Sequence, residues 1–519
     1  MLKVVNPVDE ITAARLVELL DPSTPWNRSL WSLGTVLTLR EILEASEANR
    51  TGILSDESIK RLGQACMRLL GKDPGVPDGE KNVLNEALRT SPRYDGLSYH
   101  TISQLAESID ANYLTRWAAF FAGNVPSQPE RSARSIAAYL TDHGFSEEFL
   151  HTWWTKWLYK DPTELTLPQV CELAHRELAS LQPLDYEILV AFKNAPRSAS
   201  GFPIRWKTAE DVSRWLRSNH FDVENVRVSG GFIMTIRAKD SRAAVQRAAD
   251  RMDHILARSS VATARPLEAW PAIWVKGERS CFAFGPRARG VRVKALYRED
   301  QIFAESDSNV DAAIDLLAHL ENSSPSAAIA GGWAAMEALL AEPNDRAGAA
   351  ESLASLVACS FPRAELTVLS YTAERLCPDL PLKDCTENRD RALVLGKAII
   401  AGHTLNLRKH TDQAALRRMT KVLQAPSHCL SDVQTYVADT FQRLYRQRNL
   451  ILHGGKTNSV ALRGSLRTAA KLVGAGMDRI THGWYVKGVR PLEVAARAKS
   501  ALRLVPNADP QACVDLLGI

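Results

Sequence analysis

Apolar residues recur at three- and four-residue intervals along most of this 519-residue chain, a spacing that is typical of amphipathic α-helices. The pattern runs through residues 1–182, changes to strand-like alternation after Leu184, and returns from Asn309 onward. A chain of this length is too long for one hydrophobic core, so we expect about three domains. The sequence therefore predicts a mostly α-helical, multidomain protein with domains at 1–182, 183–305 and 306–519.

The first of these regions is predicted to be helical throughout. The expected helices are 36–46, 55–70, 78–89, 101–121, 131–143 and one that Ser146 caps. On that last helix Trp153, Trp154 and Trp157 share one face, which favours helix packing over a platform for stacking bases. Without a nucleotide or metal motif, the region is interpreted as a sensor, adaptor or scaffold.

The central region has the pattern of a small α+β domain. The expected strands are 186–192, 226–228, 232–237, 272–276 and 291–297, and the expected helices are 208–220 and 240–257. A ferredoxin-like fold has the order strand, helix, strand, strand, helix, strand, which this pattern approaches. Helical spacing then resumes, with helices expected at 310–320, 327–340, 347–359, 364–375, 391–401, 412–423, 431–452 and 459–481.

Charge is unevenly distributed along the chain. The net charge is +5, but residues 391–519 contain 20 lysines and arginines against 7 aspartates and glutamates, a local balance of +13. A segment of this kind is suited to a polyanion such as RNA, although a solvated surface would give the same excess.

Composition also limits the cellular setting. No apolar run approaches the ~18 residues of a membrane span, and Pro7 interrupts the N-terminus before a signal-peptide core. We therefore expect a cytoplasmic protein that does not bind a membrane. The eight cysteines are widely spaced and include no Cys-x-x-Cys pair, so we expect mostly buried thiols, no metal site and no cofactor.

The stretch with the most chemical content is Arg448-Asn449-Leu-Ile-Leu-His453, at the end of the predicted helix 431–452. Gly454 and Gly455 follow it, where a C-terminal cap would lie. Arg448 continues an apolar stripe, and an unpaired buried charge costs several kcal/mol, about 3 to 5 when its partner is removed. Its guanidinium therefore needs either a carboxylate partner or a cleft that holds phosphate.

Arginine and histidine at this spacing are expected by chance about once in a chain of this composition. Requiring asparagine directly after the arginine lowers that expectation to about 0.04. The position at a helix end before two glycines makes a chance match rarer still.

These residue types suit RNA cleavage without a metal. RNA supplies its own nucleophile, the 2′-hydroxyl, so cleavage needs proton transfer and positive charge on the phosphate. Imidazole as a group titrates near neutrality, which suits His453 for the proton transfers. Arg448 can hold a non-bridging oxygen through paired N–H groups, and Asn449 can orient the ring or the substrate. The products would be a 2′,3′-cyclic phosphate and a 5′-hydroxyl.

The Arg-Asn-x-x-x-His motif, with Trp333 and Glu337 on an earlier helix and the glycine pair after the histidine, resembles HEPN-domain ribonucleases, in particular their ApeA-like branch. The resemblance covers about residues 309–519. It implies a helical bundle and a homodimer whose two motifs share one cleft, with Arg448, Asn449 and His453 as catalytic residues and Glu337 in support. We also expect the neighbouring cations Arg443, Arg446 and Lys456 to contact RNA.

The same resemblance implies a bacterial antiviral defence or abortive-infection toxin that cuts tRNA or another essential RNA after a phage-derived or protein trigger. Some HEPN proteins are non-catalytic binding or dimerisation modules, which is the alternative function. In a purely structural interpretation Arg448 pairs with Glu337, and His453 interacts with the helix dipole. Four other histidines are rival bases, but none follows an Arg-Asn pair at this spacing: His403, His410, His428 and His482.

Overall fold

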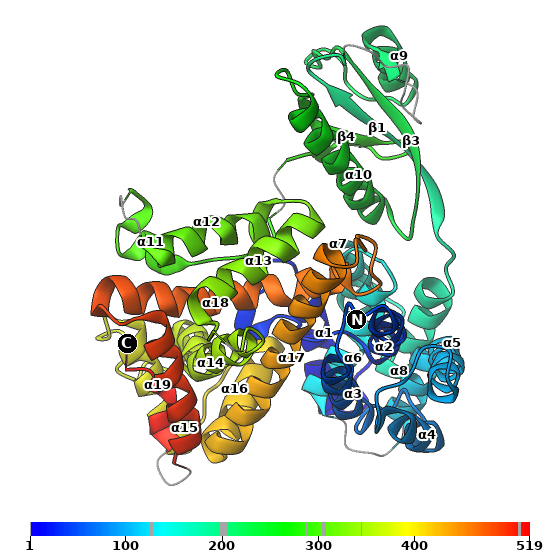
Figure 1. The fold of residues 1–519 in the computed structure, drawn as a ribbon. Helices are drawn as coiled ribbons and strands as arrows, with labels where there is room; N and C mark the ends of the chain where they lie inside the picture. Colours follow the sequence, from blue (N-terminus) through cyan, green and yellow to red (C-terminus); the bar gives the residue numbers. More distant parts are fainter. Residues whose placement is uncertain are drawn as a thin grey trace.

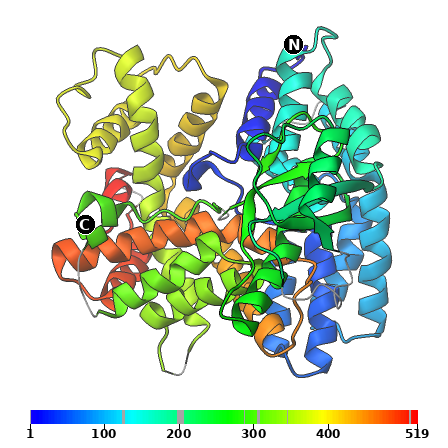
Figure 2. The ribbon, with the colours of Figure 1, turned by 90° about the horizontal axis from the view of Figure 1, so that it is seen from above.

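The computed structural model describes residues 2–123, 128–196, 206–285, 288–303, 308–343, 345–506 and 510–518. Within these residues the chain is mostly helical and contains one small antiparallel sheet, which confirms the predicted fold class. N-terminal and C-terminal helices form two neighbouring masses, and the sheet stands at one end of them (Figure 1). Seen from above, the sheet lies over the N-terminal helices (Figure 2).

Among the described residues, six N-terminal helices lie where the apolar spacing predicts them, and the first and last of this region were not predicted individually. The helices of this region are α1 Pro7–Leu20, α2 Thr35–Arg50, α3 Asp56–Leu70, α4 Asp78–Leu88, α5 Leu97–Ala122, α6 Pro129–Asp142, α7 Glu147–Thr155 and α8 Leu167–Ala174. The Ser146 hydroxyl accepts a hydrogen bond from the Phe149 amide and so caps α7. Trp154 is fully buried, and Trp153 and Trp157 pack against the same core, which confirms the packing role of the tryptophan face.

The central region is a five-stranded sheet with a helix on each face. Its elements are β1 Leu184–Phe192, β2 Trp206–Thr208, α9 Ala209–Ser218, β3 Gly230–Ala238, α10 Ser241–Ala262, β4 Ala269–Val275 and β5 Phe282–Ala283. The strand order is β2-β3-β1-β4-β5 and all neighbours are antiparallel. Alternate residues of β1 point to opposite faces, so that Val190 packs with α10 and Leu189 with α9.

Two predicted strands are wrong, and with them the ferredoxin-like order. Residues 226–228 are irregular, because Val226 and Val228 pack beside α9 without joining the sheet. Residues 291–297 leave the sheet altogether. Val291 joins the C-terminal helical core, and Lys294–Arg298 form helix α11.

The C-terminal helices are mostly longer than predicted. They are α12 Asn309–Asn322, α13 Pro325–Leu340, α14 Gly348–Leu376, α15 Asn388–Ile400, α16 His410–Gln424, α17 Pro426–Leu452, α18 Leu462–Lys487 and α19 Pro491–Leu504. The predicted helices 347–359 and 364–375 are one helix, α14, which continues through Pro362. Phe361 and Pro362 are both buried there, and this burial outweighs the backbone hydrogen bond that proline cannot make. Helix α19 was not predicted.

Helix α14 is also long and apolar enough to cross a membrane by length and composition, although 78% of its apolar window is buried inside the fold. Core helices pass the same test, so this feature carries no weight for either setting.

Helix α17 lies between the two helical masses and contributes to both cores. Val437, Phe441 and Leu444 belong to the C-terminal core, whereas Leu450 belongs to the N-terminal core. Helix α17 therefore joins the two helical regions, and separating either region from it would expose apolar side chains.

Candidate active site

The motif stretch ends α17 as its glycines predict. Helical hydrogen bonding stops at Leu452, and Gly455 adopts a left-handed conformation with φ of 62°. Its amide donates to the Ile451 carbonyl at 3.1 Å, which closes the last turn. His453 sits at the C-cap position and is thereby turned out to solvent.

Three predicted catalytic residues meet at this corner. The Nη1 atom of Arg448 donates to the Asn449 Oδ1 atom at 2.9 Å and lies 3.0 Å from the His453 Nε2 atom. Asn449 is buried, Arg448 is half-buried and His453 is exposed. Asn449 was expected to orient the ring or the substrate. Within the chain, its amide oxygen instead holds the guanidinium.

The contact between Arg448 and His453 bears on the chemistry of the ring. A guanidinium can only donate hydrogen bonds, so a hydrogen bond between the two needs the Nε2 atom of His453 as acceptor. An imidazole that accepts at Nε2 carries its proton on Nδ1, which is the form that a general base needs before reaction. The same contact occupies the lone pair that would take a proton from RNA.

Glu337 does not pair with Arg448. Its carboxylate accepts from the Trp333 indole at 2.9 Å and lies 3.4 Å from Arg346. Trp333 in turn packs against Tyr445, with ring centroids 4.8 Å apart, just before the motif on α17. Glu337 thus positions an aromatic support for α17, and Arg448 has no carboxylate partner among the described residues.

Arg443 and Arg446 are not placed where RNA can reach them. Both are buried and bind the same carboxylate, Glu41 on α2, at 2.7 Å for Arg443 and 2.9 Å for Arg446. Burial opposes the charge on Glu41, but the two guanidinium groups outweigh it and hold the pKa of that carboxyl below its usual value. The prediction that these arginines contact RNA does not fit this geometry, because they join α17 to the N-terminal region.

Lys456 continues the same junction just after the motif. Its ammonium lies 3.0 Å from Glu44 and 3.4 Å from Glu47, also on α2. Partial burial opposes its charge, but the two carboxylates raise the pKa of the ammonium. The half-buried lysine is already paired, so an RNA phosphate would have to compete with both carboxylates.

Much of the basic C-terminal excess is matched within the chain. Besides the pairs above, Arg418 binds Glu130, Arg467 binds Asp142 and Arg463 binds Asp250. All three carboxylates belong to the N-terminal or central regions. Several of the C-terminal cations that the charge pattern offered to a polyanion are therefore paired with carboxylates of the same chain.

The rival histidines have other surroundings. The His403 ring contacts the Ala398 carbonyl, and the His482 ring lies 3.1 Å from Glu299. Burial and the nearby Arg479 lower the pKa of His482 despite this carboxylate. Among the described residues there is no group of three histidine, cysteine, aspartate or glutamate side chains that could hold a metal ion.

Two features near the site were missed by sequence reasoning. Gln447 is fully buried beside the motif, and neither polar atom of its amide has a hydrogen-bond partner in the part of the chain that the structure describes. Leu452, directly before His453, has 53% of its surface exposed. Neither has a signal in the sequence, because both depend on which face of α17 each region covers.

Of the eight cysteines, five are buried as expected: Cys66, Cys171, Cys359, Cys429 and Cys513. Comparison of the chain with protein-family models, with curated proteins and with solved structures finds no match.

Proposed function

We propose that the protein is a metal-independent endoribonuclease of the HEPN type, with its active site at Arg448, Asn449 and His453. One observation carries the proposal: the three side chains converge at the end of α17, with the histidine exposed and the arginine free of any carboxylate among the described residues.

In the proposed reaction His453 Nε2 removes the proton from a ribose 2′-hydroxyl. The resulting 2′-oxygen attacks the adjacent phosphorus, and the bond from phosphorus to the 5′-oxygen breaks. A second acid gives a proton to the departing 5′-oxygen. Arg448 gives up its contact with His453 for the phosphate and stabilises the charge that develops there, while its hydrogen bond to Asn449 persists. No water is consumed before the cyclic phosphate forms.

The second acid is expected to come from a second copy of the chain. A twofold axis beside the corner would place each His453 opposite its own copy. Exposed apolar surface next to the motif supports this arrangement, because Leu452 and Val460 are about half exposed at 53% and 47%. We therefore propose a homodimer through the C-terminal region.

The biological form of the proposal is a cytoplasmic toxin of bacterial antiviral defence, in which a phage-derived or protein trigger releases cleavage of tRNA or another essential RNA. Growth tests it. Expression of the wild type should arrest a bacterial host, or do so once phage is added, and His453→Ala should abolish the arrest. Equal growth under all these conditions would argue against a toxin.

A biochemical assay tests the chemistry directly. Purified protein is incubated with total RNA in EDTA, and the new ends are examined for 2′,3′-cyclic phosphates. We expect His453→Ala and Arg448→Ala each to slow cleavage by about 10² to 10⁴-fold. His403→Ala is the matched control, because its ring contacts only a backbone carbonyl. Loss of activity in EDTA would exclude the metal-free mechanism, and full activity in Arg448→Ala would exclude the role of that residue.

A non-catalytic RNA-binding or dimerisation module is the second candidate. It is favoured by the Arg448 N–H that occupies the His453 lone pair in the single chain. RNA that is bound but left intact, with binding weakened in Arg448→Ala, would support this alternative.

A further inference from the structure

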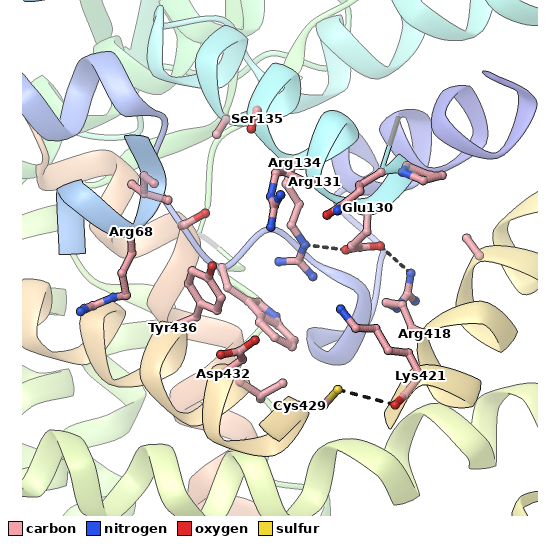
Figure 3. A pocket seen from close by; sticks show the side chains of 18 of the residues that line it. Arg68, Glu130, Arg131, Arg134, Ser135, Arg418, Lys421, Cys429, Asp432 and Tyr436 are labelled. Atoms are coloured by element: carbon pink, nitrogen blue, oxygen red, sulfur yellow. Dashed lines mark hydrogen bonds and ion pairs between the residues drawn. The ribbon is translucent and has the colours of Figure 1, made fainter. Parts of the chain in front are cut away.

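A cavity of about 560 Å³ lies between the two helical regions, away from the motif. The loop before α2, together with α3 and the start of α6, forms one side. The other side is formed by α14, α16 and the first turns of α17. Its volume is that of sites for small molecules. Figure 3 shows Tyr436 on one side of this cavity and Arg418 with Lys421 on the other.

The cavity lining is strongly basic. Its cations are Arg68, Arg131, Arg134, Arg417, Arg418 and Lys421, and its carboxylates are Glu130 and Asp432. Six positive side chains therefore face two negative ones. Like charges in a partly enclosed space repel one another more strongly than in open water, so this excess favours an anion.

Some of these cations are paired with carboxylates within the fold and are therefore excluded as ligands for an anion. Glu130 accepts from Arg134 at 2.5 Å and from Arg418 at 2.7 Å. Burial opposes its charge, but Arg15, Arg418 and Arg134 hold the pKa of Glu130 well below its usual value. Arg68 makes two bonds of 2.7 Å to Asp439. These side chains belong to the junction between the regions.

Three cations remain. Arg131, Arg417 and Lys421 have no carboxylate partner among the described residues, and Asp432 lies 3.8 Å from His428 instead. Arg131 comes from the N-terminal side and the other two from α16, so that an anion between them would contact both regions. Arginine and lysine placed in this way are suited to phosphate oxygens.

The rest of the lining suits a flat, apolar group. Trp31 is buried with the Arg134 guanidinium 4.7 Å from its ring centre, and it packs edge-on against Phe361 at 5.5 Å. Tyr436 is half-buried and completes an aromatic wall. Helices α2 and α6 both begin at the cavity without a side-chain cap, so backbone N–H groups of their first turns add further donors.

We propose that this cavity is a binding site for a nucleotide, with its phosphates held by Arg131, Arg417 and Lys421 and its base against Tyr436. The site does not depend on nuclease activity at the motif, so each can be tested without the other.

The test uses the full chain and isothermal titration with ATP, GTP, NAD⁺, adenosine and pyrophosphate. We expect at least one of the three nucleotides to bind, and adenosine to bind at least tenfold more weakly. Arg131→Ala/Lys421→Ala should weaken nucleotide binding tenfold or more, whereas the remote surface variant Arg497→Ala should not change it. Tyr436→Ala should weaken the nucleotide but not pyrophosphate.

Three results would overturn the proposal: binding of none of the nucleotides, unchanged affinity in the double variant, or pyrophosphate binding as tightly as the nucleotide. A measurement on the wild-type chain tests the site without relying on variants that could misfold. Bound nucleotide should lower acetylation of Lys421 severalfold while the half-buried Lys499 reacts as before. Equal acetylation of Lys421 with and without nucleotide would count against the site.

Discussion

Helix α17 carries two kinds of arginine only five residues apart. Arg443 and Arg446 are buried and bind Glu41. Arg448 is half-buried, and its polar contacts among the described residues are with Asn449 and His453. The first two join regions of the fold, and the third keeps its charge available. The comparison teaches that the partner, rather than the residue type or its position in a basic segment, separates a structural arginine from a candidate for chemistry.

The largest expected effect comes from removing the carboxylate that Arg443 and Arg446 share, because it tests whether these arginines are structural. Glu41→Ala leaves two buried guanidinium groups without a counter-charge, so we expect the free energy of unfolding to fall by about 3 to 5 kcal/mol. Urea denaturation followed by circular dichroism measures it. Arg448→Ala is the matched comparison and should change stability by less than about 0.5 kcal/mol. Similar losses in both variants would show that the two kinds of arginine do not differ.

Acid should act on the same carboxylate more gently. The folded-state pKa of Glu41 lies below that of an unfolded glutamate, so its contribution is fully present above about pH 4.3 and is lost as the pH falls toward the folded-state pKa. Urea denaturation at a series of pH values should show a steeper loss for the wild type than for Glu41→Gln below about pH 4.3. Parallel curves would contradict this role of Glu41.

Asn449 tests the second kind of arginine, Arg448, through the hydrogen bond that it accepts from that side chain. Asn449→Ala removes the acceptor that holds Arg448, and we expect RNA cleavage to slow by about tenfold, the equivalent of about 1.4 kcal/mol. The variant should keep the EDTA resistance of the wild type. An unchanged rate would mean that Arg448 needs no support within the chain.

The smallest effect is expected at Lys456. Its contacts with Glu44 and Glu47 are partly exposed, so Lys456→Ala should cost less than about 1 kcal/mol of stability. If RNA displaces those carboxylates from the lysine, the variant will also bind RNA more weakly in a filter-binding assay. Unchanged RNA affinity would leave Lys456 a purely structural residue.

Local chemistry explains which parts of this fold were predictable. Ser146 and Asp240 start their helices through hydrogen bonds to residues three positions on, so the sequence contains both partners. The glycine stop after His453 is a local signal of the same kind. The contact of Arg448 with His453, five positions apart, instead depends on the end of the helix at Leu452. Proline, by contrast, was a misleading local signal at position 362, where packing from other helices keeps α14 intact.

What could not be predicted depends on residues far apart in the chain. Glu41 lies 402 positions before Arg443, and nothing local distinguishes that arginine from one that binds RNA. The cavity likewise combines residues from Ile11 to Tyr436. Val291 alternates with basic residues like a strand, yet it packs on helices because the chain leaves the sheet there.

The sharing of α17 bears on how such a protein can change during evolution. A recombination event that joined residues 306–519 to a new N-terminal region would deliver Arg443, Arg446 and Leu450 without Glu41 and without the apolar surroundings of that leucine. Helix α17 of that fragment would then carry two guanidinium groups without a carboxylate partner. The motif-bearing region therefore cannot be joined to an unrelated N-terminal region without a loss of stability. A natural relative that has it beside a different N-terminal region should also have its own acidic residue opposite those arginines.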